Sequence, residues 1–303
     1  MSAAVAPIHG LVDAIAPPER RGVERDAVRL LVTGRAKREH SHAHFFDLPS
    51  FLRRGDLLVV NDSATLPAAL SARRNNGESL MLHLSTMIGG DLWMVEPRAR
   101  VDAGEVLQLP ESGSVVLLAP VEPERPRVWY ASFRLPLPMN AYLMKNGEPI
   151  RYGYLPARLP LEDYQTIFAR EPGSSEMPSA ARPFTPRVLH RLQEHGVEFA
   201  VITLHCGVAS FEKPEHPSIE RYFVSPKAAS AVNRARAERR RVVAIGTTAL
   251  RALESSFYDG KVVSSAGWTD LIIGENSAIR SVDGLLTGFH DEACTHESLL
   301  RAF

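Results

Sequence analysis

Two threonines and an Arg-Glu pair stand out in the stretch RVVAIGTTALRALESSF, residues 241–257. An apolar run ends in a glycine, Thr247 and Thr248 follow, and a helical pattern then carries Arg251 and Glu254 three residues apart. At a strand-to-helix junction, free backbone N–H groups and the positive end of the helix dipole bind carboxylate or phosphate. The stretch therefore predicts a cradle for an anionic or polar ligand. The simpler alternative is a helix capped by one of the threonines, with Arg251 and Glu254 as a surface ion pair.

Polar residues also follow two other apolar runs. His205 comes after FAVITL and before a glycine and small residues, and Asn61 and Asp62 end the segment DLLVVND. Ligand-binding side chains gather at the carboxyl ends of strands in α/β sheets. His205 has the chemistry of a general base or a hydrogen-bond donor, with a structural histidine as the simpler alternative. Cys206 has no adjacent basic partner, so we expect a buried, inert thiol rather than a nucleophile.

The segment DGLLTGFH carries a further acid and histidine, with Asp283 seven residues before His290 and Phe289 between them. An acid and a histidine on one short segment can orient each other for proton transfer. A strand followed by a turn is the alternative. Cys294 and His296 lie nearby, but the sequence offers no second ligand cluster, so no metal site is predicted.

The pattern of predicted secondary structure changes twice along the chain, and these changes predict which elements position these residues. Residues 25–62 contain a strand, a short helix and a buried strand, and residues 150–303 alternate helices with strands, which indicates a largely parallel sheet, open or closed. Residues 63–149 contain short β-prone pieces separated by Gly and Pro, which indicates a small antiparallel barrel or sandwich. Residues 25–62 are too few to fold alone. The sequence therefore predicts one α/β domain made of residues 1–62 and 150–303, with a β domain inserted at 63–149. A linear split into two domains is the alternative.

Individual elements are also predicted in the last part of the chain. A short helix is expected around residues 164–169, and longer helices are expected over PRVLHRLQEHG and PKAASAVNRARAERR. Ser225 can cap the last of these, with Pro226 at its first position. The segment WTDLIIG is predicted as a strand.

Composition limits the classes of partner and the compartment. The 303 residues are 45% hydrophobic, and 35 Lys and Arg balance 35 Asp and Glu, so charge alone does not suggest a nucleic-acid partner. Two distant cysteines indicate a reducing compartment. No signal-peptide pattern and no run of about 18 apolar residues is present, so we expect a cytoplasmic protein without a membrane partner.

Taken together, the motifs resemble those of the S-adenosylmethionine:tRNA ribosyltransferase-isomerases of queuosine biosynthesis. The matching segments, in family order, are ERDAVRLLV, HFFDLPSFLRRGDLLVVNDSATLPAAL, YQTIFAREPGS, LHCGVASF, RVVAIGTTALRALES and VDGLLTGFH. The resemblance implies a barrel-like α/β domain interrupted by a small antiparallel β-barrel. It also implies an enzyme that transfers the ribosyl part of S-adenosylmethionine to 7-aminomethyl-7-deazaguanine in tRNA, giving epoxyqueuosine, adenine and methionine. In this chemistry a base removes a proton beside the sulfonium, and S-adenosylmethionine is a co-substrate, so no metal is needed.

The resemblance carries over to individual polar positions of the motifs. It implies catalytic roles among His205, Glu254, Asp283 and His290, and substrate-binding roles for Asn61, Asp62, Thr247, Thr248, Arg251 and Phe289. A carboxylate or an imidazole would serve as the base, and Arg251 could hold the methionine carboxylate by paired hydrogen bonds. Which group is the base stays open.

The chain also departs from the family pattern. Ala64 and Ala69 stand where the family usually has arginines, and Pro183 stands where it has a histidine. Each lost phosphate contact weakens tRNA binding. Three functions remain open: action on tRNA, a paralogue that uses the same chemistry on a small-molecule acceptor, and a non-catalytic relative that binds S-adenosylmethionine.

Overall fold

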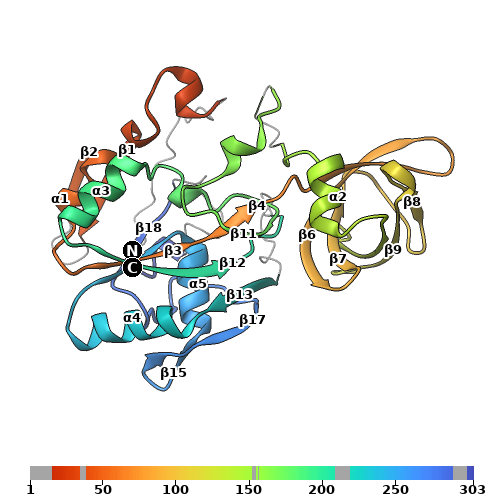
Figure 1. The fold of residues 1–303 in the computed structure, drawn as a ribbon. Coiled ribbons are helices and arrows are strands. Elements are labelled where there is room, and N and C mark those ends of the chain that lie inside the picture. The colour runs from red at the N-terminus through yellow and green to blue at the C-terminus, as the bar shows by residue number, and fades with distance from the viewer. Residues whose placement is uncertain (1–15, 35–38, 152–154, 156, 209–218, 289–298) are drawn as a thin grey trace, which may run out of the picture.

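A computed structural model describes residues 16–34, 39–151, 155, 157–208, 219–288 and 299–303. Its two main parts are an open sheet covered by helices and a closed β-barrel (Figure 1). The chain enters the barrel after it has formed the first strand of the open sheet. The predicted class, a mixed α/β protein with an inserted antiparallel barrel, is confirmed. Within the described residues, no helix has the length and apolarity needed to cross a lipid bilayer.

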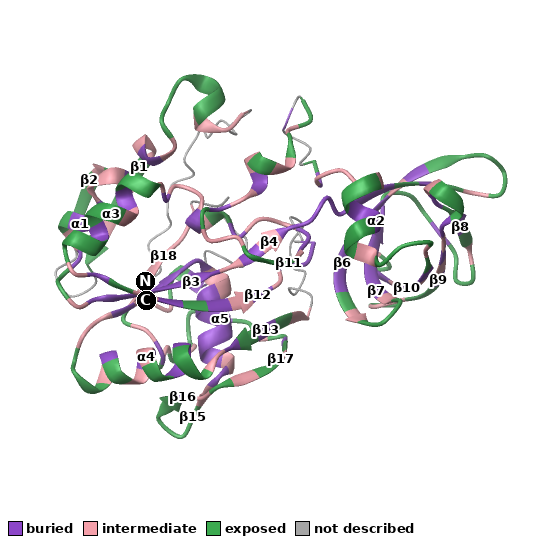
Figure 2. Cartoon of the chain, in the orientation of Figure 1, coloured by how far each residue is buried: buried purple, intermediate pink, exposed green. Residues whose placement is uncertain are grey.

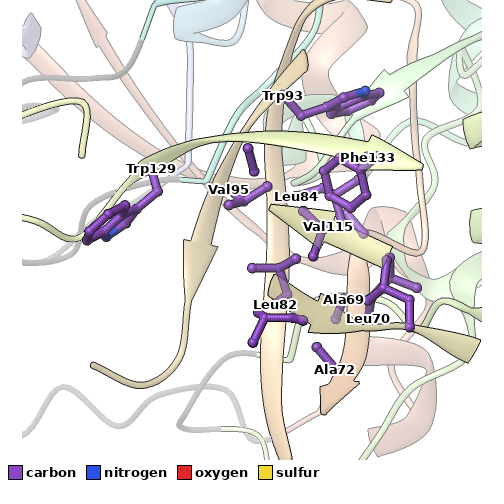
Figure 3. Packing of buried hydrophobic residues seen from close by; sticks show 14 of the residues in the cluster. Ala69, Leu70, Ala72, Leu82, Leu84, Trp93, Val95, Val115, Trp129 and Phe133 are labelled. Atoms are coloured by element: carbon purple, nitrogen blue, oxygen red, sulfur yellow. The ribbon is translucent and has the colours of Figure 1, made fainter. Parts of the chain in front are cut away.

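The barrel contains six antiparallel strands in the order β10-β7-β6-β5-β8-β9. Their bounds are β5 (Ala69–Arg73), β6 (Ser79–Gly89), β7 (Leu92–Pro97), β8 (Val106–Gln108), β9 (Ser114–Pro120) and β10 (Trp129–Arg134). Alternate side chains such as Leu82, Leu84 and Val95 fill the interior (Figure 3). Helix α2 (Met139–Asn146) packs on this core through Tyr142 and Leu143.

The main sheet has, among the described residues, six strands in the order β17-β13-β12-β3-β14-β18. They are β17 (Ser265–Thr269), β13 (Glu220–Val224), β12 (Glu198–Leu204), β3 (Leu57–Asn61), β14 (Val242–Ile245) and β18 (Gly284–Leu286). The four strands from β12 to β18 are parallel, and β13 and β17 are antiparallel to their neighbours. Every residue of β3 is buried, as expected for a central parallel strand (Figure 2). Among the described strands this sheet is open, so the barrel-like form of the α/β domain that the resemblance implied is not present there.

Helices cover both faces of this sheet because β3 alternates its apolar side chains between them. Leu57 and Val59 pack in one core with α4 (Pro226–Ala237) and α5 (Thr247–Ser255). Leu58 and Val60 pack in another core with α1 (Leu48–Phe51) and α3 (Pro186–Glu194). The predicted start of α4 is confirmed, since the Ser225 hydroxyl accepts a hydrogen bond from the Ala228 amide at 3.1 Å with Pro at the first position.

Smaller elements connect these parts. A hairpin of β1 (Arg29–Gly34) and β2 (Glu39–His44) precedes α1, and β15 (Phe257–Tyr258) pairs with β16 (Lys261–Val262) after α5. The strand β4 (Ser63–Thr65) pairs in parallel with β11 (Glu171–Ser174), outside the barrel. All barrel strands lie within residues 69–134, whereas the proposed domain limits of 62/63 and 149/150 stay a prediction.

Two predicted elements were wrong in extent. The helix expected around residues 164–169 is a single 3₁₀ turn, Leu161–Tyr164, which Pro160 precedes and the extended Gln165 ends. An isolated turn follows, closed by the Ala169 amide and the Thr166 carbonyl. The strand expected over WTDLIIG ends at Thr269, since from residue 270 the chain leaves β13, its only neighbour there among the described strands.

Candidate functional site

Three of the predicted segments meet at the carboxyl edge of the parallel strands. Asn61 is the last residue of β3, His205 follows β12, and Thr247 begins α5 two residues after the end of β14. Because β3 lies between β12 and β14, these chain ends are adjacent. The convergence expected from the strand-end rule is therefore present.

Asn61 ties these segments together. Its side-chain Nδ2 donates to the Leu204 carbonyl at 2.8 Å and to Thr248 Oγ1 at 3.2 Å. Its Oδ1 accepts from the amides of Leu204 at 2.9 Å and Ser63 at 3.1 Å. A side-chain amide has two donor and two acceptor positions, and all four are used in this fully buried residue. Asn61 thus positions β3, β12 and α5, and it has no hydrogen-bonding position left for a ligand.

The start of α5 lacks the predicted threonine cap. The N-cap residue is Gly246, whose φ of +91° is favourable only for glycine, and no side chain in the described part of the chain caps the helix. Thr248 instead accepts from Asn61, and Thr247 is half-buried at the first helical position. The backbone N–H groups of the first turn of α5 therefore lie at the carboxyl edge of the sheet without a side-chain acceptor among the described residues. Such uncapped N–H groups are suited to binding an anionic group.

Arg251 does not pair with Glu254. Its guanidinium forms a buried ion pair with Glu220, and it also donates to the carbonyls of Leu271 at 2.9 Å and Thr269 at 3.2 Å. The other oxygen of Glu220 accepts from the Gly207 amide at 2.9 Å. Arg251 therefore joins α5 to the β13–β17 side of the sheet, and the alternative of a surface ion pair is wrong.

Glu254 holds the loop before β18. Its Oε1 accepts from the amides of Arg280 at 2.9 Å and Ser281 at 2.7 Å and from the Ser281 hydroxyl at 2.6 Å. Glu254 as a whole is 5% exposed. Glu254 comes seven residues after Thr247, and seven residues of α-helix advance about 10 Å. Glu254 is therefore about two turns away from the start of α5. Its observed contacts are structural.

Asp283 lies at the wrong edge of the sheet for the predicted site. Its Oδ2 accepts from the amide of Val242 at 2.8 Å, and its own amide donates to the Val242 carbonyl at 2.8 Å. Val242 is the first residue of β14, four residues before Gly246, which separates Asp283 from the carboxyl edge by about 13 Å. The structure therefore does not bring Asp283 to the other residues. Its predicted partner His290, like Phe289, lies outside the described residues.

Asp62 remains at the carboxyl edge. Its Oδ1 accepts from Thr203 Oγ1 at 2.7 Å on the neighbouring strand β12. Burial raises the pKa of the Asp62 carboxyl, the Thr203 hydrogen bond opposes this, and the negative charge of Glu171 adds to it. A carboxyl with a raised pKa at a strand end is a candidate for proton transfer.

His205 is linked to two serines that the sequence did not single out. Its Nδ1 lies 2.7 Å from Ser63 Oγ, which lies 2.6 Å from Ser174 Oγ. Burial lowers the pKa of His205 to about 4, and the positive charge of Arg221 adds to this. The imidazole is therefore neutral at pH 7. Ser63 and Ser174 are 111 residues apart, so no spacing pattern could have paired them.

The expected inert thiol is present, since Cys206 is buried and burial raises the pKa of its thiol. Metal ligands are a separate matter: within the described ranges, no three His, Cys, Asp or Glu side chains are grouped so that they could hold an ion.

The fold and site together define a mixed α/β protein with an inserted antiparallel barrel and a buried polar network at the carboxyl edge of its sheet. A family described as "Queuosine biosynthesis protein" matches residues 12–303, and the chain belongs to this family.

Named relatives are similar over most of their length. The chain is 38% identical over 292 residues to the S-adenosylmethionine:tRNA ribosyltransferase-isomerase of Moorella thermoacetica, covering 92% of this chain and 85% of the relative. It is 39% identical over 308 residues to the protein of the same name from Thermus thermophilus, covering 95% and 88%. A crystal structure of an S-adenosylmethionine tRNA ribosyltransferase from Thermotoga maritima matches with 28% identity and a TM-score of 0.48, covering 92% of this chain and 82% of that one.

Proposed function

We propose that this protein is an S-adenosylmethionine-dependent ribosyltransferase-isomerase. It transfers the ribosyl moiety to a 7-aminomethyl-7-deazaguanine base of tRNA and rearranges it to epoxyqueuosine, with release of adenine and methionine. The observation that carries the proposal is the membership of the queuosine biosynthesis family over residues 12–303. The convergence of Asn61, His205 and the start of α5 at one edge of the sheet supports it.

The site offers groups for the methionine carboxylate of this co-substrate and for the proton beside its sulfonium. The first-turn amides of α5 provide a positive dipole end for the methionine carboxylate, beside Thr247. The guanidinium of Arg251 is already paired with Glu220, so Arg251 could bind that carboxylate only while it also binds Glu220. The reaction needs a base for the proton beside the sulfonium, whose positive charge acidifies that carbon. Asp62, with its raised pKa, is a candidate for this base, whereas Glu254 and Asp283 are engaged in structural hydrogen bonds.

A small-molecule acceptor is the second candidate, favoured by the sequence at the entrance to the barrel. Ala64 lies in β4 and Ala69 begins β5, so both positions that lack the expected arginines are on the strands joining the two parts of the fold. The neutral net charge points the same way. In this alternative, the S-adenosylmethionine chemistry is retained and only the acceptor differs.

One assay separates these functions. The protein is incubated with S-adenosylmethionine in four mixtures: alone, with tRNA carrying the deazaguanine precursor, with tRNA lacking it, and with the small molecules of a cell extract. Adenine and methionine are followed by mass spectrometry. Release only with the precursor tRNA is the expected result. Release without tRNA, or only with small molecules of a cell extract, would favour the second candidate. Binding of S-adenosylmethionine without turnover in any mixture would leave a non-catalytic protein.

A further inference from the structure

A continuous chain of hydrogen bonds runs from a backbone amide to the His205 ring. The Cys206 amide donates to Ser174 Oγ at 2.9 Å, Ser174 Oγ lies 2.6 Å from Ser63 Oγ, and Ser63 Oγ lies 2.7 Å from His205 Nδ1. Both serines are at most 1% exposed. The hydroxyl hydrogens of this chain are therefore placed inside the protein, where an unpaired one is unfavourable.

Counting hydrogens gives the chain a direction. A backbone N–H only donates, so Ser174 accepts at the first link. If Ser174 then donates to Ser63 and Ser63 donates to Nδ1, every hydrogen has an acceptor. If His205 Nδ1 instead carries a hydrogen and donates to Ser63, one of the two hydroxyl hydrogens has no acceptor in the chain, and the structure gives neither hydroxyl another partner among the described residues. Among the described residues, the buried network is therefore fully paired only when Nδ1 accepts.

The position of the ring is fixed as well. The His205 amide donates to the Arg221 carbonyl at 2.9 Å, which holds the backbone at the end of β12. Gly173 lies against the ring, and a Cβ built on it would come within 2.5 Å of His205 Cε1 and Nδ1. The ring therefore has a set orientation in addition to a set hydrogen-bond pattern.

We propose that Ser63 and Ser174 are positioning residues that hold His205 as a neutral imidazole with its proton on Nε2. His205 then serves the reaction as a hydrogen-bond donor from Nε2 to an acceptor atom of the bound S-adenosylmethionine or of the departing adenine, and it is not the base. The role in turnover depends on the proposed function, whereas the state of the ring does not. Protonation of Nδ1 would reverse the chain, so the network itself disfavours the charged form. The lowered pKa of His205 agrees with this.

Nitrogen NMR tests the ring state without any substrate. Two-bond ¹H–¹⁵N correlations on the full chain, labelled at its 11 histidines, are recorded at neutral pH, and His205 is assigned by its loss in His205→Gln. We expect a proton on Nε2 and an unprotonated, accepting Nδ1. Ser63→Ala should give a mixture of tautomers, whereas Ser63→Thr, which keeps the hydroxyl, should retain the Nε2–H form. Ser71→Ala, at an exposed position of β5, is the matched control and should change nothing.

A proton on Nδ1 or a charged ring in the wild-type protein would overturn the proposal. Because the wild-type spectrum alone decides this, a Ser63→Ala variant that fails to fold leaves the test intact.

Kinetics test the role of the ring. Glutamine keeps a donor near the Nε2 position but cannot accept a proton, so we expect His205→Gln to retain kcat within about tenfold, while His205→Ala loses about 100-fold. Equal losses in both variants would indicate that the ring acts as a base. If NMR shows the proton on Nε2 but no mixture gives turnover, the proposed function is contradicted and this inference is not. If the protein turns over S-adenosylmethionine but carries the proton on Nδ1, this inference is contradicted and the proposed function is not.

Discussion

The Arg251 side chain shows how far a residue's neighbours in the fold can differ from its neighbours in the sequence. A spacing of three residues on a helix suggested Glu254 as its partner, yet the buried partner is Glu220, at the start of β13. Glu254 instead accepts three hydrogen bonds from residues 280 and 281. Both side chains are buried, so we expect their replacement to affect the stability of the fold.

Arg251→Ala should therefore destabilise the protein. Removing one partner of a buried ion pair leaves Glu220 uncompensated, and we expect the free energy of unfolding to fall by roughly 3 kcal/mol. Urea denaturation measures this change. Arg234→Ala is the control, because its contact with Glu198 at 3.6 Å is exposed and its loss should change stability by no more than about 0.5 kcal/mol. Equal effects of the two variants would contradict a buried role for Arg251.

His205 should make stability depend on pH. Its pKa is about 4 in the folded protein and 6.5 as the ordinary value, so the unfolded chain binds the proton first as pH falls. Stability is then lost from about pH 6.5 down to about pH 4, by up to roughly 3 kcal/mol. Thermal or urea unfolding at several pH values should show a smaller loss over this window in His205→Gln than in the wild type. A wild-type curve that is parallel to that of the variant would exclude this contribution.

At the scale of elements, the His205 ring packs against strand β11 at Gly173. Gly173→Ala would place a methyl group 2.5 Å from the ring, and small displacements of a reacting group cost large factors in rate. We expect kcat to fall roughly 100-fold with little change in the binding of S-adenosylmethionine. Gly89→Ala in β6, where an added Cβ meets nothing within 4 Å, is the matched control. Unchanged kcat in Gly173→Ala would mean that the ring position is not important.

The sequence predicted the elements and their edge better than the contacts between them. Asn61, His205 and Thr247 each follow an apolar run, and the rule that parallel strands share a carboxyl edge brings them together. Asp283 precedes its strand and so lies at the amino edge, away from the other residues, and its catalytic role stays a prediction. Ser63 and Ser174 could not be found, since a hydrogen bond between residues 111 positions apart leaves no local pattern.

At the scale of the whole molecule, charge bears on the choice of acceptor. The chain carries 35 positive and 35 negative side chains, and many arginines are held by carboxylates, including Arg98 and Arg127 by Glu96. The hydrogen bond from His83 and the two arginines outweigh burial and hold the pKa of Glu96 at about 2. These arginines are partly neutralised before any phosphate approaches.

Binding of tRNA should therefore depend weakly on salt. Each phosphate contact contributes about 0.9 to the slope of log K against log salt, and we expect a slope smaller in magnitude than about 3. Fluorescence anisotropy with labelled tRNA between low and physiological salt gives this slope. A slope steeper than about 6 would reveal a phosphate-binding surface that the balanced charge does not suggest.

The barrel is inserted in the sequence, but it is not a detachable module. The carbonyl of Ser85 in β6 accepts from the Ser175 hydroxyl at 2.7 Å, and the Ser85 hydroxyl accepts from the Val208 amide at 3.0 Å. Ser175 and Val208 each lie within three residues of the network around His205. A chimera that exchanges the barrel with that of a relative must therefore carry over the geometry at Ser85. Without that geometry, exchanging the barrel would also displace Ser175 and Val208, and with them the segments that carry Ser174 and His205.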